Sequence, residues 1–405
     1  MAEGNTVETK PVETWITGIG LASSLGEGIE ANWDALTNGA LNVDETTYAP
    51  FLVHPLAPVN FDKQIPKRGD QRQMEPWQRI GTYIAGLALE SAGIKGNAEI
   101  LGRMDMIVAA GSGERDLAVD GAILTESVKG NVAPDFLNVR LQSDLRPTLF
   151  LAQLSNLLAG NISIVHGVTG SSRTFMGEEA SSIDAVRVAL ARIASGQSDI
   201  ALVGAAHNAE RKDLLLVYEF GKFNLRDKFV PVWAREPNGG FALGSGGAFL
   251  VLESKQHAQA RGARPFAKLS AVVADHARRS GANAASAVTD SLTALWTRLH
   301  PDAGANAIIT GATGAEPATS QERRFLNQHE TSAIRATGSR FGHLMEAQFP
   351  LGIALAAFAV SKGALFPPSD STGLEIAMSA RPSQIVVIGT GHWRGEGMAL
   401  VGAAD

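Results

Sequence analysis

Short, mostly apolar segments alternate with amphipathic segments along almost the whole chain, and this alternation constrains the fold more than any other feature. Segments such as Thr14–Gly20 and Ile200–Gly204 are nearly continuous apolar runs, which is typical of strands buried on both faces of a sheet. Elsewhere apolar residues recur every three or four positions, as at Ile29, Trp33 and Leu36, which is the spacing of one helix face. The pattern predicts an α/β protein with largely buried sheets.

This strand–helix order occurs twice, first up to about residue 255 and again from near Arg264. Since no Pro- or Ser-rich linker separates the two series, we expect one compact double unit with an N-terminal half at residues 12–255 and a C-terminal half at 256–405. The segment Tyr48–Gln73, rich in Pro, Lys and Arg, is expected to form an irregular surface excursion. The other expected elements are a helix at Ile80, Ile84 and Leu87, a strand at Asp105–Gly111, a helix at Ala180–Ser195, strands at Gly246–Glu253 and Phe266–Val273, a helix at Val288, Leu292, Leu295 and Leu299, a strand at Ala307–Thr310, a helix at Pro350–Lys362, and strands at Ile385–Gly389 and Met398–Val401.

Composition excludes several classes of function. The chain has 405 residues and a net charge of −6, which argues against nucleic acid as a partner because phosphate binding needs a basic face. The longest apolar stretch, Phe349–Val360, is too short to span a membrane, and the polar N-terminus lacks a secretory signal. We therefore expect a cytoplasmic protein. The chain contains no cysteine, so disulfides, thiolate metal sites and cysteine nucleophiles are excluded.

Local motifs carry little chemistry by themselves. Gly18 and Gly20 fall short of a dinucleotide-binding fingerprint because position 23 is Ser, so we interpret them as a tight strand-to-helix turn. The nine histidines include no HxH or HxxxH pair, and the spacing predicts neither a metal site nor a cofactor.

Six segments, in this order, resemble the β-ketoacyl-acyl-carrier-protein synthases of the KAS II type, which belong to the thiolase-like superfamily. They are WITGIGLASSLGEGIEANWDALTNG, SNLLAGNISIVHGVTG, SIDAVRVALARIASGQSDIALVGAAHN, EPNGGFALGSGGAFLVLES, FGHLMEAQFPLGIALAAFAVSKGALFPP and IGTGHWRGEGMALV. The resemblance implies a duplicated five-layer α-β-α-β-α sandwich, which agrees with the two series of elements. It also implies a catalytic Cys at the start of a buried helix and two catalytic His residues.

This sequence departs from that catalytic set. A gapless count back from Gly196 places Glu179 at the position of the family's Cys, although Glu178 beside it leaves a one-residue uncertainty about which carboxylate faces the pocket. Gly311 stands at the position of the first His, whereas His343 retains the second. A carboxylate is a weak nucleophile toward thioesters, so covalent acyl loading is lost. A carboxylate at the N-terminus of this helix could instead accept hydrogen bonds from the backbone N–H groups that form the oxyanion hole in the family.

The resemblance also points to four positions that would line the substrate pocket. These are Thr313 in the first-His motif, Gly338 where the family has a lysine, and Gly391 and His392 in the closing loop. The family sequence in that loop is G-F-G-G, so His392 replaces the gating Phe. The bulky Trp393 and Arg394 follow it, which indicates that the gate is rebuilt.

The intact framework around a degenerate site favours a non-condensing, chain-length-factor-like subunit. Such a subunit would pair with an active β-ketoacyl synthase as a heterodimer, or with itself as a homodimer, through an apolar strand expected at Asn161–His166. The alternatives are a residual acyl-thioester enzyme such as a malonyl-carrier-protein decarboxylase, or an acyl-binding scaffold. Acyl carrier proteins are acidic, so a basic patch would be the docking face. The candidates for that patch are Lys67, Arg68 and Arg72, or Arg323 and Arg324.

Overall fold

The computed structural model describes residues 12–404 except 112, 148, 150–152, 236–238, 303–306, 330 and 331. The polar N-terminal segment and the first residues of the segment that starts at Glu236 lie outside this part of the chain. Within it, no helix is long and apolar enough to cross a lipid bilayer.

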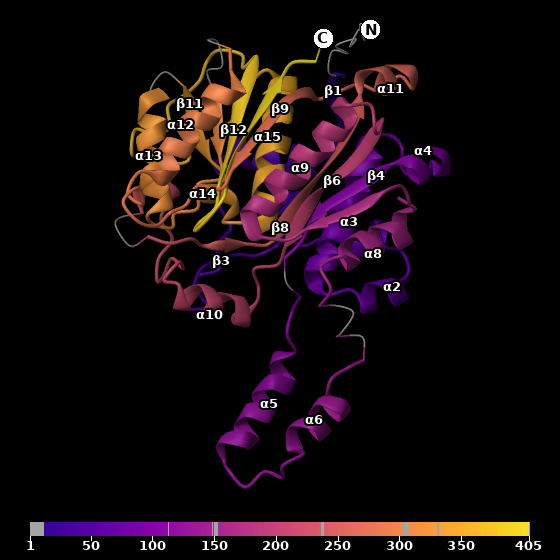
Figure 1. Cartoon of the computed structure of the whole chain (residues 1–405), viewed down its shortest axis with the longest axis vertical. Coiled ribbons are helices and arrows are strands. Elements are labelled where there is room, and N and C mark those ends of the chain that lie inside the picture. The colour runs from indigo at the N-terminus through magenta and orange to yellow at the C-terminus, as the bar shows by residue number, and fades with distance from the viewer. Residues whose placement is uncertain are drawn as a thin grey trace, which may run out of the picture.

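One mixed sheet runs through the molecule in the order β11-β10-β12-β13-β9-β1-β8-β6-β4-β5, with β2 paired to β1 (Figure 1). Strands β1 and β9 pair at only two positions, Trp15 with Lys268 and Ile16 with Ala267, so the sheet divides there into two halves. The strands are β1 Thr14–Ser23, β2 Gly26–Glu27, β4 Asp105–Ala109, β5 Ser172–Phe175, β6 Ile200–His207, β8 Gly246–Ser254, β9 Ala267–Asp275, β10 Ala307–Thr310, β11 Ala333–Ala336, β12 Gln384–Thr390 and β13 Glu396–Gly402. A separate small sheet joins β3 Val53–His54 to β7 Leu243–Gly244.

Helices form three layers around the two sheet halves. The central layer is α9 Glu178–Ala194 and α15 Gln348–Lys362, whose apolar side chains share one core with strands of both halves. Helices α3 Pro76–Ser91 and α8 Leu157–His166 cover one outer face. Helices α12 Ala287–Leu299 and α13 Ala318–Leu326 cover the other. The architecture is therefore the predicted five-layer sandwich. The remaining helices of the described residues are α1 Ile29–Thr37, α2 Arg68–Gln73, α4 Ala98–Arg103, α5 Leu117–Val128, α6 Phe136–Asp144, α10 Lys212–Phe220, α11 Lys255–Ala260, α14 Gly338–Phe341 and the short η1 Phe61–Lys63, η2 Val232–Ala234, η3 Asn327–His329 and η4 Met345–Ala347.

The expectation of a strand at Asn161–His166 is wrong, because this segment is the second half of α8. Leu158, Ala159 and Ile162 are buried on one face of the helix, which ends at Gly167 with a left-handed backbone, φ 77°. The alternation of apolar residues in NISIVH resembles a strand, but packing against α3 selects the helix. The strand that precedes α9 is β5, which ends the sheet and pairs with β4 alone among the described residues.

The segment Tyr48–Gln73 is less irregular than expected. It contains β3 and the short helix α2, and Leu52, Val53 and Ile65 are buried. It therefore supports the core beside β7 rather than lying wholly on the surface.

Gly18 and Gly20 lie inside β1 and not in a turn, so that interpretation is also wrong. They allow β1 to approach α3 closely. A Cβ atom on Gly18 would lie 2.5 Å from the carbonyl oxygen of Ala88, and one on Gly20 would lie 2.6 Å from the backbone nitrogen of Ala88. Contacts of this length with backbone atoms are not tolerated without movement of the helix.

Gly20→Ala is accordingly expected to lower the free energy of unfolding by about 2 kcal/mol, as overpacking of a close-packed core does. Gly121→Ala is the matched control, since Gly121 lies within α5 and a Cβ there would meet nothing within 4 Å. That change should be neutral or slightly stabilising because Ala favours helix. Urea unfolding measures both, and equal stability of the two variants would refute the close approach.

A helical hairpin of α5 and α6 projects away from the layered body (Figure 1). Arg140 of α6 donates to both carboxylate oxygens of Glu126 on α5, at 2.9 and 3.0 Å, and so joins the two helices. The hairpin exposes a set of large apolar side chains, namely Leu117, Leu124, Val128, Val132, Leu137, Val139 and Leu141. Large apolar side chains exposed together are uncommon on protein surfaces and are a feature of many interaction sites.

Candidate functional site

A sharp turn between β5 and α9, the elbow, positions the side chain of Glu179. Gly177 has φ 138°, and Glu178, the first residue of α9, has φ 56°. A positive φ at a non-glycine residue carries backbone strain and often marks a functional turn. The next residue, Glu179, consequently lies in the first turn of α9 with its side chain in the protein interior, where its exposed fraction is 3%.

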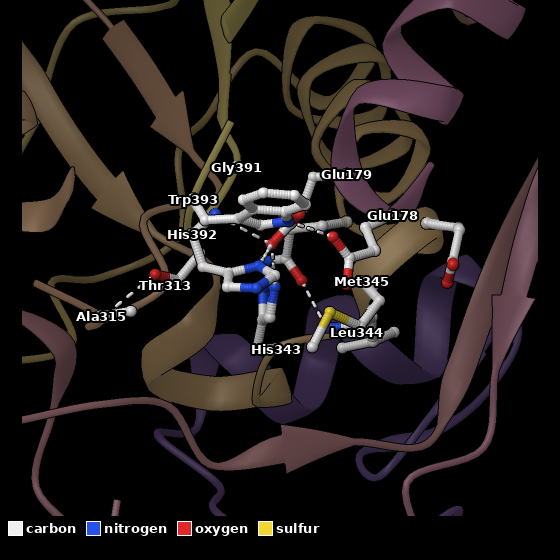
Figure 2. A network of polar contacts seen from close by, with 12 residues as sticks. Glu178, Glu179, Thr313, Ala315, His343, Leu344, Met345, Gly391, His392 and Trp393 are labelled. Carbon is white, nitrogen blue, oxygen red and sulfur yellow. Dashed lines mark hydrogen bonds and ion pairs between the residues drawn. The ribbon is translucent and has the colours of Figure 1, made fainter. Parts of the chain in front are cut away.

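Two histidines converge on the Glu179 carboxylate, as Figure 2 shows. Its Oε1 atom lies 2.7 Å from Nε2 of His343 and 2.9 Å from Nδ1 of His392. The backbone N–H of His392 also donates to Oε1, at 3.2 Å. Both imidazole rings are almost fully buried. The carboxylate therefore accepts a backbone donor of the closing loop, as a negative charge in an oxyanion hole would.

The two histidines of this cluster differ in the direction in which their pKa is shifted. Burial raises the pKa of Glu179, but the charge of His392 and the hydrogen bond from His343 outweigh it, and the pKa lies well below its usual value. Burial lowers the pKa of His392, yet Glu179 raises it above the ordinary value. For His343 burial dominates over Glu179, so its pKa is lowered. We infer an ion pair between Glu179 and His392, with His343 as a neutral donor.

Glu178 points to a different place. Its Oε1 accepts from the Tyr218 hydroxyl at 3.2 Å, and its Oε2 accepts from the indole nitrogen of Trp393 at 2.5 Å. Trp393 is half-exposed, with 51% of its surface accessible. Of the two neighbouring carboxylates, Glu179 faces the histidines and Glu178 ties the closing loop to α10.

Gly311 lies just beyond β10, and the side chain of Gln348 occupies the space beside it. A Cβ on Gly311 would lie 2.8 Å from Cγ of Gln348. The Gln348 amide is fixed there, because its oxygen accepts from the backbone N–H of Leu344 at 2.8 Å and its nitrogen donates to Thr337 Oγ1 at 2.5 Å. Sequence reasoning missed Gln348, since no motif reveals that the start of α15 points to this position.

The other predicted pocket positions divide into two groups. Gly391 adjoins the carboxylate, because a Cβ there would lie 3.3 Å from Glu179 Oε2. Thr313 instead accepts from the backbone N–H of Ala315 at 3.0 Å. Gly338 begins α14, and a Cβ there would lie 2.9 Å from the carbonyl oxygen of Ala312. The structure thus brings Glu179, His343, Gly391 and His392 together and turns Thr313 toward its own loop.

A cavity of about 240 Å³ adjoins the elbow and was not predicted from the sequence. Glu178 and Tyr218 line it next to the closing loop, and Glu346 and His207 line it further along. Nδ1 of His207 lies 3.7 Å from Glu346 Oε2, and Nε2 of His207 has no hydrogen-bond partner in the described part of the chain. These polar side chains distinguish the cavity from an apolar tunnel, and their wide separation in sequence hid them from pattern analysis.

Glu322 is a second buried carboxyl group near the site. It lies on α13 and accepts from the hydroxyl of Thr310 at the end of β10. Burial raises its pKa from 4.5 to about 7. Because the folded-state pKa is above the unfolded one, the protonated carboxyl stabilises the fold fully below pH 4.5, and this contribution is lost as pH rises through 7.

Glu322→Gln should remove this pH dependence. Relative to the unchanged protein, the variant is expected to gain up to about 3 kcal/mol of stability between pH 4.5 and pH 8, the equivalent of the pKa difference. Urea unfolding at several pH values tests this. A constant difference between the two proteins across that range would show that Glu322 titrates normally.

The sequence of this chain is similar to those of known β-ketoacyl synthases. The family model for the β-ketoacyl synthase N-terminal domain matches residues 13–258. The chain is 27% identical over 264 residues to 3-oxoacyl-[acyl-carrier-protein] synthase 2 of Vibrio cholerae, an alignment that covers 63% of this chain and 61% of that protein.

Solved structures are similar over nearly the whole chain. The ishigamide ketosynthase/chain length factor aligns with a TM-score of 0.79 and 19% identity, covering 98% of this chain and 100% of that one. A type II PKS acyl-carrier protein in complex with its ketosynthase aligns with a TM-score of 0.76 and 17% identity, covering 98% and 100%. The chain belongs to the β-ketoacyl synthase family and has its KAS II-like, thiolase-type fold.

Proposed function

We propose that this protein is a non-condensing, chain-length-factor-like subunit that pairs with an active β-ketoacyl synthase. The observation that carries the proposal is the Glu179 carboxylate held between His343 and His392 at the elbow. Transfer of an acyl group from a thioester to a carboxylate would form an anhydride, which lies uphill. An ionised, hydrogen-bonded carboxylate is in addition a poor nucleophile.

The position of the first histidine supports the same conclusion. Gly311 offers no side chain to stabilise an enolate, and Gln348 fills the adjacent space. Decarboxylation of a malonyl thioester needs donors at the developing oxyanion. His343 remains, but it already faces Glu179. Both half-reactions of condensation are therefore unsupported in this chain alone.

The pairing surface that we propose combines the β5 edge with the α5–α6 hairpin. Both belong to the stretch between β4 and α9, and the hairpin presents exposed apolar side chains. An uncovered sheet edge and an apolar hairpin are both costly to leave in water. The similar structure of the ishigamide ketosynthase/chain length factor favours a partner of this class.

An acyl carrier protein is the second partner that we propose. The neighbour determined with an acyl-carrier protein favours this class. Lys67, which directly precedes α2, and Arg68 and Arg72 within it are exposed and suit an acidic partner. Arg323 and Arg324 donate to the carbonyl oxygens of Trp233 and Ala285, which makes the α2 group the better docking candidate.

The test is reconstitution with candidate active synthases from the same source. Size-exclusion chromatography and native mass spectrometry should detect a heterodimer, and acyl groups should appear only on the partner after addition of acyl carrier protein. A chain that stays a homodimer with every candidate and elongates acyl groups alone would overturn the proposal.

The polar cavity beside the elbow favours residual acyl-thioester chemistry as a second candidate. A malonyl-carrier-protein decarboxylase would release carbon dioxide in a reaction that depends on His343. Equal release by the unchanged protein and by His343→Ala would exclude it.

A further inference from the structure

The elbow cluster contains three side chains that can ligate a metal ion. Glu179, His343 and His392 each offer one ligand atom, and these three atoms lie within 4.8 Å of one another. They come from the start of α9, the loop after α14 and the loop between β12 and β13. Two of the three are departures from the synthase pattern, because Glu179 stands at the Cys position and His392 at the gating Phe.

The hydrogen bonds within the cluster leave two buried polar atoms without a partner among the described residues, Oε2 of Glu179 and Nδ1 of His343. Both imidazoles approach Oε1 of Glu179 instead. A buried carboxylate oxygen without a partner costs free energy. Gly391 lies beside Oε2 and contributes no side chain. The cluster therefore keeps a buried acceptor for which no described residue supplies a donor.

We propose that Glu179, His343 and His392 form a binding site for a divalent first-row transition metal ion such as Zn²⁺. Two imidazole nitrogens and one carboxylate are a donor set that Zn²⁺ uses when it keeps a fourth position open. Mg²⁺ and Ca²⁺ prefer all-oxygen ligands and are not expected to bind. This inference concerns metal binding and does not depend on the pairing with another subunit.

The distances from Oε1 of Glu179 to the two ring nitrogens need only small adjustments. A tetrahedral Zn²⁺ with bonds of about 2.0–2.1 Å holds its ligand atoms roughly 3.3 Å apart. The present separations from Oε1 are 2.7 and 2.9 Å, so each ring nitrogen must move away by about half an ångström. Each bound nitrogen gives up its proton to solvent or to the other nitrogen of its ring.

A cavity reaches the neighbourhood of the cluster, although the three proposed ligands do not line it. Gly177, Glu178 and Tyr218 line it, and the Tyr218 ring lies 5.5 Å from the His392 ring, centre to centre. Glu178 places a carboxylate in this cavity, which favours entry of a cation. A bound ion would hold the closing loop, which carries His392, against the start of α9.

The test uses the full, tag-free chain after treatment with a chelator. Equilibrium dialysis against Zn²⁺ alone, with metal analysis, should give one ion per chain. Glu179→Gln and His392→Phe should each weaken binding at least 100-fold. His257→Gln is the matched control. Nδ1 of His257 lies 2.7 Å from Oε2 of Glu253, outside the proposed site, so this change should leave Zn²⁺ binding unaltered. Co²⁺ should give the visible absorption of a low-coordinate site, and Ca²⁺ should not compete.

The variants must be shown to fold by circular dichroism. If Glu179→Gln does not fold, His392→Phe and the Co²⁺ spectrum of the unchanged chain decide. Absence of stoichiometric Zn²⁺, equal Zn²⁺ binding by His392→Phe, or equal competition by Ca²⁺ would each overturn the proposal.

Discussion

Charged side chains at Leu124 and Leu137 on the α5–α6 hairpin are expected to weaken subunit pairing at least 100-fold while the fold stays intact. Their exposed fractions are 64% and 52%, so the isolated chain loses no core packing when they change. Burial of a leucine at an interface contributes about 1.5–3 kcal/mol, and a glutamate there must also be desolvated. A 100-fold loss corresponds to about 2.8 kcal/mol, which the double variant Leu124→Glu, Leu137→Glu should exceed.

Leu216→Glu with Val217→Glu is the matched control for this experiment. These residues lie on α10 with exposed fractions of 52% and 61%, so the change in charge and exposure is the same at a place off the hairpin. Sedimentation equilibrium of homodimers, or titration of the active synthase, measures both variants. Equal affinities for the hairpin and α10 variants would remove the hairpin from the proposed interface.

An element can be predicted from the sequence when its own residues determine it, and cannot when contacts with other elements do. Long apolar runs such as those of β6, β8 and β12 are correctly predicted because burial on both faces leaves a signal within the run itself. The segment Asn161–His166 is not, because its apolar spacing suits both a strand and a helix and contact with α3 decides. Gly20 was misinterpreted for the same reason, since the close approach of α3 is a tertiary feature.

In the candidate site, too, residues within one motif were predicted, whereas contacts between distant motifs were not. A gapless count placed Glu179 at the elbow, and the closing-loop motif picked out His392. Their convergence could not be predicted from spacing, because 164 residues separate Glu179 from His343 and 213 separate it from His392. Sequence spacing likewise gave no hint of Gln348 beside Gly311. Pattern reasoning finds residues within a motif, whereas the fold alone decides which motifs meet.

Glu179→Cys is expected to convert a chain that takes up no acyl group into one that is acylated at a single position. A thiol in the first turn of α9 would have its pKa lowered by the helix N-terminus and would be present partly as thiolate. The thiolate attacks the thioester carbonyl, and the carrier thiol leaves with a proton. The backbone N–H of His392, now 3.2 Å from Glu179 Oε1, is placed to stabilise the oxyanion. Intact-mass spectrometry after incubation with an acyl thioester should show one acyl addition.

Glu178→Cys provides the control, since it makes the same change one residue earlier. Glu178 is turned toward Tyr218 and Trp393, away from His343, so its acylation should be at least 100-fold slower. Faster loading at position 178 than at 179 would mean that the elbow is displaced by one residue from the synthase pattern. Condensation should still fail in the Glu179→Cys variant, because Gly311 supplies no side chain and Gln348 blocks the space that a histidine would need. We therefore expect the Glu179→Cys variant to regain acyl loading but not chain elongation.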